Sequence, residues 1–269
     1  MSEEVTPCAG DYVFVSDVHL GGFEVAENER IERNMLELLR HVEENKLRLV
    51  IAGDLFDYWM DYRNQWPRIF DRVLEAFQGF HERTQTSTLF ITGNHDNWTG
   101  PKLPEIGFEL EHEYRILEIE QRKVLVMHGD GLSDPDMKLP RPAFHRFLRN
   151  PYFIKLYQFF FPPAAGIELM RQFSKKSKLR DYMLRPDNKP RMLDVWATEF
   201  LKADNKADVL LCGHHHNAIH LKVGTREYLN LGNFGFGETL ALHTKEGFAL
   251  VKWDCANRRF QHLKTAITV

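Results

Sequence analysis

The first third of the chain alternates short apolar runs with stretches of helical periodicity. Residues 12–16 form a β-branched and aromatic run that ends in a glycine loop, and apolar residues then recur at helical spacing over residues 31–42. A continuous apolar run follows at 47–52, a second amphipathic stretch at 69–80, and a third apolar run at 88–92. This β-α-β-α-β order predicts a mixed α/β sheet with buried central strands.

Later in the chain, strands follow one another with fewer helices between them. Alternation begins at Tyr114, a turn is expected at Gln121-Arg122, and residues 124–127 complete a hairpin. A helix is expected over 192–202, and further strands at 208–212, 218–223, 227–231, 248–253 and 260–264. The pattern predicts an α/β fold of two packed sheets with helices outside. The expected core comprises residues 1–136 and 192–269, interrupted by a basic, Phe-rich helical insert at 137–191.

Composition places the chain among ordinary globular proteins, with 43% hydrophobic and 27% charged residues. The three cysteines have no CxxC spacing, which argues against a disulfide framework and against a cysteine zinc site. The first residues lack the features of a secretory signal, and no apolar run is long enough to span a bilayer. We therefore expect a cytoplasmic protein.

Charge is unevenly distributed along the chain. Residues 138–191 carry 13 Lys and Arg against 3 Asp and Glu, although the whole chain has a net charge of -3. A basic segment on an otherwise acidic protein indicates an anionic partner, such as a nucleic acid, a membrane surface or a phosphorylated small molecule.

Five polar clusters each follow directly after an expected strand. In chain order they are Ser16-Asp17-Val18-His19, Gly53-Asp54-Leu55-Phe56-Asp57, Gly93-Asn94-His95-Asp96, His128-Gly129-Asp130 and Gly213-His214-His215-His216. Ligands of α/β sheets bind where loops leave the carboxyl ends of strands, so the clusters are expected to form one site. A single cluster of this kind arises by chance in many chains, whereas five in order do not.

The residue types in these clusters indicate a metal centre. Asp, His and Asn ligands without cysteine suit divalent ions such as Mn, Fe or Zn, and their number exceeds what one ion needs. Two ions bridged by a carboxylate can hold both the attacking and the leaving oxygen of a phosphoryl displacement. We expect two divalent ions and favour Mn.

The motifs DVH, GDLFD, GNHD, HGD and GHHH together resemble the ordered motif set of the calcineurin-like metallophosphoesterases. The resemblance implies a four-layer αββα sandwich of two mixed sheets around a dinuclear centre. Within that superfamily, GDLFDYW, RNPYF, the Ser-Lys-Lys-Ser-Lys stretch and Leu231-Gly232-Asn233 are similar to the UDP-2,3-diacylglucosamine pyrophosphatases of lipid A synthesis.

The resemblance also implies a ligand set, with Asp54 as the bridge between the ions. The first ion is assigned to Asp17, His19, Asp54 and His216, and the second to Asp54, Asn94, His128 and His214. His215 is expected to face away, and a register that uses His215 instead remains an alternative. Spacing supports the assignment, because Asp-x-His and His-x-His place two side chains on the same side of an extended segment.

His95 and Asp57 are the expected catalytic pair. The resemblance directs His95 at the substrate phosphate, where an imidazole can protonate the leaving oxygen or stabilise developing charge. Asp57 is expected to hold that imidazole, although a turn-capping role is the simpler alternative. The chain departs here from the best-known lipid A enzymes, which have an arginine in place of His95.

The insert combines ten Phe and Tyr side chains over residues 140–190 with the basic residues counted above. Such helices can bind an anionic amphiphile as a lid or can contact the inner-membrane surface through residues 140–190. A solvated helical subdomain is the simpler alternative, and the clustered Phe side chains argue against nucleic acid. By resemblance, Asn94, His95, Ser174, Lys175 and Lys178 are expected to bind substrate.

These observations predict a metal-dependent hydrolase of the pyrophosphate of UDP-2,3-diacylglucosamine, releasing UMP and 2,3-diacylglucosamine 1-phosphate. A phosphodiesterase or phosphatase for another nucleotide or phospholipid is the alternative within enzymes. A non-catalytic membrane-surface or scaffold module is the alternative of another class.

Overall fold

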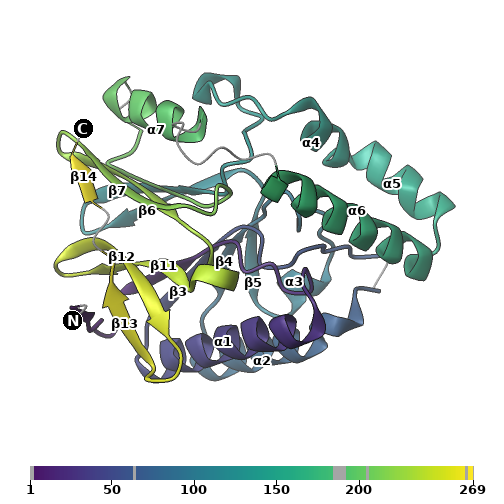
Figure 1. Ribbon diagram of the computed structural model, residues 1–269, viewed down its shortest axis with the longest axis horizontal. Coiled ribbons are helices and arrows are strands. Elements are labelled where there is room, and N and C mark those ends of the chain that lie inside the picture. The colour runs from purple at the N-terminus through teal and green to yellow at the C-terminus, as the bar shows by residue number, and fades with distance from the viewer. Residues whose placement is uncertain (1–2, 63–64, 184–191, 204–205, 264–265, 269) are drawn as a thin grey trace.

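The computed structural model describes residues 3–62, 65–183, 192–203, 206–263 and 266–268, and of residues 173, 175–183 and 266–268 it describes the backbone alone. Figure 1 shows two sheets packed face to face, with a group of helices beyond one end of them. The expectation of an α/β fold with two mixed sheets is confirmed.

The larger sheet has eight strands in the order β1-β13-β12-β11-β2-β3-β4-β5. The strands β2, β3, β4 and β5 run parallel to one another, and the remaining neighbours pair antiparallel. In sheet order the strands are β1 Glu4–Val5, β13 Arg259–His262, β12 Gly247–Asp254, β11 Thr239–Thr244, β2 Tyr12–Val15, β3 Arg48–Ala52, β4 Thr88–Ile91 and β5 Phe108–Glu111.

The smaller sheet has six strands in the order β14-β9-β10-β8-β7-β6. It is also mixed, since β8 pairs parallel with both β7 and β10 while β6 and β9 close antiparallel hairpins. In sheet order the strands are β14 Ala266–Thr268, β9 Ala218–Val223, β10 Arg226–Leu231, β8 Val209–Cys212, β7 Arg122–Met127 and β6 Tyr114–Ile119.

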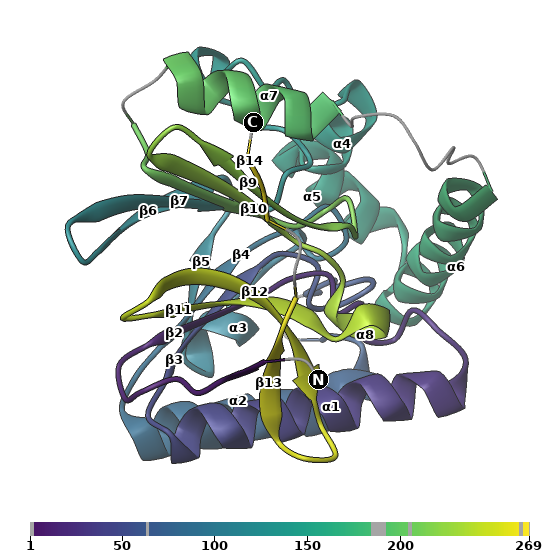
Figure 2. The same cartoon turned by 60° about the vertical axis from the view of Figure 1, so that its left-hand side comes forward.

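Side-chain alternation along the strands builds a four-layer sandwich. Val13 and Val15 face helices α1 (Val25–Glu44) and α2 (Asp71–Thr84), whereas Phe14 between them packs against the second sheet. The far face of the second sheet packs on helix α7 (Met192–Ala203) through residues such as Leu193 and Phe200. Figure 2 shows the resulting order of layers, with α7 above, the two sheets between, and α1 and α2 below.

Helices α4, α5 and α6 follow the hairpin of the second sheet and lie beyond the ends of the strands (Figure 1). Helix α5 begins at an Asn-Pro pair because the Asn150 side chain accepts from the Tyr152 and Phe153 amides. The helices are α1 Val25–Glu44, α2 Asp71–Thr84, α3 Lys102–Glu105, α4 Ala143–Leu148, α5 Pro151–Phe160, α6 Pro163–Met183, α7 Met192–Ala203 and α8 Phe234–Gly237, with 3-10 turns at Arg68–Phe70 and Pro135–Met137. Within the described ranges no helix combines the length and apolarity needed to cross a bilayer.

The structure corrects several predicted boundaries. The hairpin turn lies at Glu120 and Gln121, both with positive φ, one residue before the expected position. Helix α1 starts at Val25, six residues earlier than its apolar periodicity indicates, because its first turns carry mostly polar side chains. Strands β5 and β11 were not predicted, since Phe108–Glu111 is short and Thr239–Thr244 is interrupted by polar residues.

Candidate metal centre

The five polar clusters meet where β2, β3, β4, β7 and β8 end. The loops after β2 and β3 run side by side, because the Asp17 amide donates to the Gly53 carbonyl at 3.1 Å and the His19 amide to the Asp54 carbonyl at 3.0 Å. The loop after β8 joins them where the Gly213 amide donates to the His128 carbonyl at 3.0 Å. Backbone hydrogen bonds therefore hold the loops that carry the expected ligands.

Close approach of these loops requires glycine at two positions. A Cβ atom on Gly213 would collide with Ser16 Oγ and with Asp17 Oδ2, and one on Gly93 would collide with Asp54 Oδ1. The glycine that precedes each of these two motifs thus allows a carboxylate from another loop to lie against the backbone.

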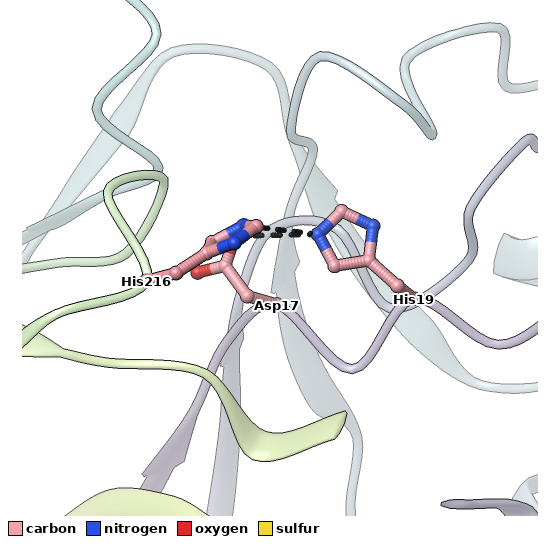
Figure 3. Close-up of side chains that lie close together, drawn as sticks. All are labelled: Asp17, His19 and His216. Atoms are coloured by element: carbon pink, nitrogen blue, oxygen red, sulfur yellow. Dashed lines mark hydrogen bonds and ion pairs between the residues drawn. The ribbon is translucent and has the colours of Figure 1, made fainter. Parts of the chain in front are cut away.

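The first group of candidate ligands comprises Asp17, His19 and His216 (Figure 3). His216 Nε2 lies 3.1 Å from Asp17 Oδ1 and 3.2 Å from His19 Nε2, so three ligand atoms from two loops face one point. His216, and not His215, completes this group. Two imidazole nitrogens and a carboxylate oxygen form a donor set that suits a divalent transition metal.

The second group comprises Asp54, Asn94, His128 and His214. Asn94 Oδ1 lies 3.1 Å from His128 Nε2 and 3.0 Å from His214 Nδ1, and Asp54 Oδ2 lies 3.3 Å from His128 Nε2. The same Asp54 oxygen is 3.8 Å from His19 Nε2 of the first group. Asp54 Oδ2 therefore stands between the two groups, where a bridging carboxylate is needed.

Each carboxylate of these groups has one oxygen fixed by the protein and one turned toward the site. Asp17 Oδ2 accepts from Ser16 Oγ and from the His214 amide, and Asp54 Oδ1 accepts from the His95 amide. Asp17 Oδ1 is buried and accepts no hydrogen bond from the described residues. A buried carboxylate oxygen without a donor fits a cation ligand, since an unsatisfied buried acceptor costs about 1–3 kcal/mol.

Backbone strain is concentrated at the same residues. Asp17, His19, Asp54, His214 and His216 all have φ between 52° and 69°, in the left-handed region. Non-glycine residues adopt this region uncommonly and at an energetic cost, and such strain clusters at functional sites. Five candidate ligands that share it indicate a backbone arranged to aim side chains.

Electrostatic interactions in the site favour ionised carboxylates. Burial raises the pKa of Asp17 and Asp54, but His216 beside Asp17 and His128 beside Asp54 outweigh it and hold both pKa values well below the ordinary range. Burial works in the opposite sense on His128, and Asp54 still raises the pKa of this imidazole to about 10.

Asp57 lies against the first group and contacts both His19 and His95. Its carboxylate Oδ1 is 3.2 Å from His19 Nδ1 and 3.9 Å from His95 Nδ1, so the side chain orients His19. The imidazole of His95 instead donates from Nδ1 to the Asp57 backbone carbonyl at 2.8 Å. His95 packs edge-on against His19 with ring centroids 5.0 Å apart, which places it beside the site.

Helix α6 reaches the same position through Ser174. Its hydroxyl donates to Asp57 Oδ2 at 2.6 Å and lies 3.2 Å from His95 Nδ1, and the residue is 8% exposed. We expected Ser174 to bind substrate, and no sequence pattern indicates its contact with Asp57, which is 117 residues away in the chain. The side chains of Lys175 and Lys178 lie outside the described residues.

Asp96 and Asp130 support the loops from outside both groups. Asp96 accepts from the Gly93 amide at 2.7 Å and from the Leu55 amide at 2.8 Å, and burial together with the charge of Asp54 raises its pKa to about 7. Asp130 is paired with Arg149 at 3.0 Å, and Arg149 also donates to the Gly93 carbonyl at 2.7 Å. Helix α4 is thereby tied to the ends of β4 and β7.

Comparison with known proteins identifies the family to which the chain belongs. The sequence profile described as calcineurin-like phosphoesterase matches residues 11–218, which is most of the chain and includes all of the candidate ligands. This chain belongs to the calcineurin-like phosphoesterase family. The family implies divalent metals, and the two groups around Asp54 have the donor chemistry to hold them.

Individual relatives agree with the family. The phosphoesterase is 28% identical over 219 residues to a protein of Porphyromonas gingivalis named UDP-2,3-diacylglucosamine hydrolase, covering 76% of this chain and 82% of the relative. It is 27% identical over 243 residues to a protein of Coxiella burnetii with the same name, covering 87% and 94%. Both resemblances found in the sequence are confirmed, and the chain is an enzyme that hydrolyses phosphoester bonds.

Among solved structures, this phosphoesterase matches a phosphoesterase from E. coli with a TM-score of 0.45 and 16% sequence identity. The match covers 93% of this chain and 96% of the other.

Proposed function

We propose that the enzyme hydrolyses the pyrophosphate bond of UDP-2,3-diacylglucosamine, releasing UMP and 2,3-diacylglucosamine 1-phosphate. The observation that carries the proposal is Asp54 Oδ2, which lies within 3.8 Å of a ligand nitrogen in each of two groups. Relatives named for this substrate, aligned over most of the chain, support the choice of substrate within the phosphoester class.

Two divalent ions, for which we favour Mn, are assigned to the two groups. One would be held by Asp17, His19, Asp54 and His216, and the other by Asp54, Asn94, His128 and His214. When bound, the ions supply the positive charge that activates water and offsets the negative charge of the phosphoryl group.

The catalytic residue contributed by the chain itself is His95. Because its Nδ1 is occupied by the Asp57 carbonyl, the proton that His95 can donate to a leaving oxygen is on Nε2. Asp57 is a positioning residue, since its carboxylate orients His19 and its carbonyl orients His95. Asn94 and His95 are assigned to the substrate phosphate, and Lys175 and Lys178 remain proposed contacts to the substrate.

Helices α4–α6 are assigned to the lipid part of the substrate and to the inner-membrane surface. Seven of the thirteen large hydrophobic side chains that are exposed in the described part of the chain lie between residues 144 and 161. The opposite face of α5 packs on the core, where Tyr157 contacts Trp98 at a ring distance of 5.1 Å. Exposed aromatic side chains on a basic segment are typical of a surface that meets anionic lipid. We propose that the insert at residues 137–191 acts as a lid on the core through helices α4–α6; residues 184–191 lie outside the described part of the chain.

The test of the substrate is turnover by Mn-loaded protein of UDP-2,3-diacylglucosamine, UDP-N-acetylglucosamine and an aryl phosphodiester. Release of UMP that depends on the acyl chains supports the proposal, with His95→Ala as the inactive control. Cleavage of the aryl diester without release of UMP would leave a phosphoesterase and refute this substrate. Absence of metal binding and of all turnover would instead favour a scaffold module.

The test of the membrane surface is co-sedimentation with vesicles. Binding to phosphatidylglycerol vesicles that exceeds binding to phosphatidylcholine, and that falls in Phe159→Ser/Phe160→Ser, is expected. Equal binding of the variant and the original chain would contradict the assignment.

A further inference from the structure

Helix α4 places His145 beside the second ligand group, whereas His95 lies beside the first. The ring of His145 meets that of His214 edge-on, with centroids 6.5 Å apart. His95 stands in the corresponding relation to His19 in the first group, with centroids 5.0 Å apart. Each ligand group is therefore flanked by an imidazole that belongs to neither group, and His215, whose ring centroid lies 5.5 Å from that of His214, also stands beside the second.

The two flanking histidines also have matching carboxylate neighbours. Nδ1 of His145 lies 3.9 Å from Asp130 Oδ2, and Nδ1 of His95 lies 3.9 Å from Asp57 Oδ1. Both carboxylates are buried, with side chains 3% and 1% exposed. Asp130 Oδ2 is already paired with Arg149 at 3.0 Å and with Arg141 at 3.4 Å, so the proton of a neutral His145 can lie on Nε2, from which it can be donated.

Hydrogen bonding at His145 is incomplete, unlike that at His95. Its Nδ1 is buried and has no hydrogen-bond partner among the described residues. The side chain as a whole is 25% exposed, so the accessible part of the ring lies away from Nδ1. An imidazole with one nitrogen buried toward a carboxylate and the rest accessible beside a metal position can contact a bound anion.

We propose that His145 binds the second phosphoryl group of a diphosphate substrate, the one that water does not attack. The inference rests on the proposed phosphoesterase function, and it names the second phosphoryl group as the part of the substrate that the site recognises. His95 serves the phosphoryl group that reacts, and His145 donates a hydrogen bond to its neighbour. A monophosphate diester, which lacks the second group, gains nothing from His145.

The experiment compares His145→Ala with the unmodified, Mn-loaded enzyme in two assays. The first is kcat/KM on UDP-2,3-diacylglucosamine, where a loss of about 10- to 100-fold is expected, as for a hydrogen bond to a charged group. The second assay measures how strongly UDP-N-acetylglucosamine or UMP inhibits the hydrolysis of an aryl phosphodiester. Weaker inhibition by UDP-N-acetylglucosamine, with unchanged inhibition by UMP and unchanged diester turnover, is expected.

His145→Gln is the conservative variant. Its side-chain amide N–H can donate a hydrogen bond, so this variant is expected to restore part of the kcat/KM that His145→Ala loses on the diphosphate substrate. Equal losses on diester and diphosphate, or equal inhibition of His145→Ala and the unmodified enzyme by UDP-N-acetylglucosamine, would overturn the proposal. The inhibition assay does not require lipid turnover. If the unmodified enzyme leaves UDP-2,3-diacylglucosamine intact, the proposed substrate fails while the role of His145 is still decided by inhibition.

Discussion

The sheet edge and helices α4–α6 contribute polar groups to one site by different means. At the edge, ligands lie on loops joined by backbone hydrogen bonds, with left-handed backbone angles at Asp17 and Asp54. The helices contribute single side chains, such as Ser174 to Asp57 and Arg149 to the Gly93 carbonyl. The candidate metal ligands thus lie on the core, and side chains from the helices contact their supporting residues from one side.

This difference predicts a hierarchy of effects. Side chains at the sheet edge are the proposed metal ligands, so substituting them is expected to abolish catalysis. Groups on the helices act through other residues or on the substrate, so their loss weakens binding or selectivity.

The largest effect is expected at the bridge between the two ligand groups. Asp54→Asn removes the negative charge shared by both groups, and a loss of several kcal/mol of stabilisation corresponds to a fall in kcat/KM of about 1000-fold or more. Asp11→Asn, a carboxylate that precedes β2 and belongs to neither ligand group, is the matched control and keeps full activity. Retention of normal turnover by Asp54→Asn would contradict a shared carboxylate.

The next effect belongs to His95, which lies at the sheet edge but outside both ligand groups. His95→Ala is expected to lower kcat by about 100- to 10000-fold, as for loss of a general acid, with bound metal unchanged. Steady-state kinetics and metal analysis of the same sample separate the two effects. Loss of metal together with activity would identify His95 as a ligand.

A smaller effect is expected from the helix side. Ser174→Ala removes the hydrogen bond that holds Asp57 behind His19, and a rise of about 10-fold in the Kd for Mn is expected. Gln172→Ala, two residues earlier on α6 and exposed, is the control. An unchanged Kd, measured by calorimetry, would mean that the helices do not support the metal ligands.

The smallest effect on activity is expected in the second sheet, away from the site, where a substitution changes the stability of the fold. Burial disfavours the charged form of Glu227, but hydrogen bonds from His220 and Arg122 outweigh it and lower its pKa to about 2. This carboxylate therefore stabilises the fold above its unfolded pKa near 4.5, and the contribution is lost as pH falls from there toward 2.

Glu227→Gln is accordingly expected to lower the free energy of unfolding by about 1–3 kcal/mol at pH 7. Urea unfolding at pH 7, 5 and 3.5 measures the difference, which narrows below pH 4.5 because the original side chain begins to lose its advantage. A difference independent of pH would show that packing, and not charge, accounts for the loss.

Sequence patterns predicted the sheet edge well because its ligands are local to strand ends. Each motif follows an apolar run, and the carboxyl ends of neighbouring strands converge, so Asp17, Asn94 and His216 could be assigned to one site before their distances were known. Strand β11 escaped prediction, since its sequence Thr239–Thr244 mixes polar and apolar residues on a strand that is buried by the sandwich.

Contacts made by the helices could not be predicted in the same way. Spacing gives no information on a hydrogen bond between Ser174 and Asp57, which depends on how α6 packs across the end of the sheets. The orientation of the Asp57 carboxylate toward His19 instead of His95 is a difference of less than 1 Å between two distances. Sequence motifs indicate that a residue lies at the site, but the packing of the surrounding elements determines which neighbouring side chain it contacts.

Whether two ions share Asp54 can be measured by anomalous diffraction from crystals of the Mn-loaded enzyme. Two peaks per chain are expected, about 3.5–4 Å apart, with Asp54 coordinating both. A single peak, or two peaks of which only one contacts Asp54, would contradict the sharing of Asp54 by two ions.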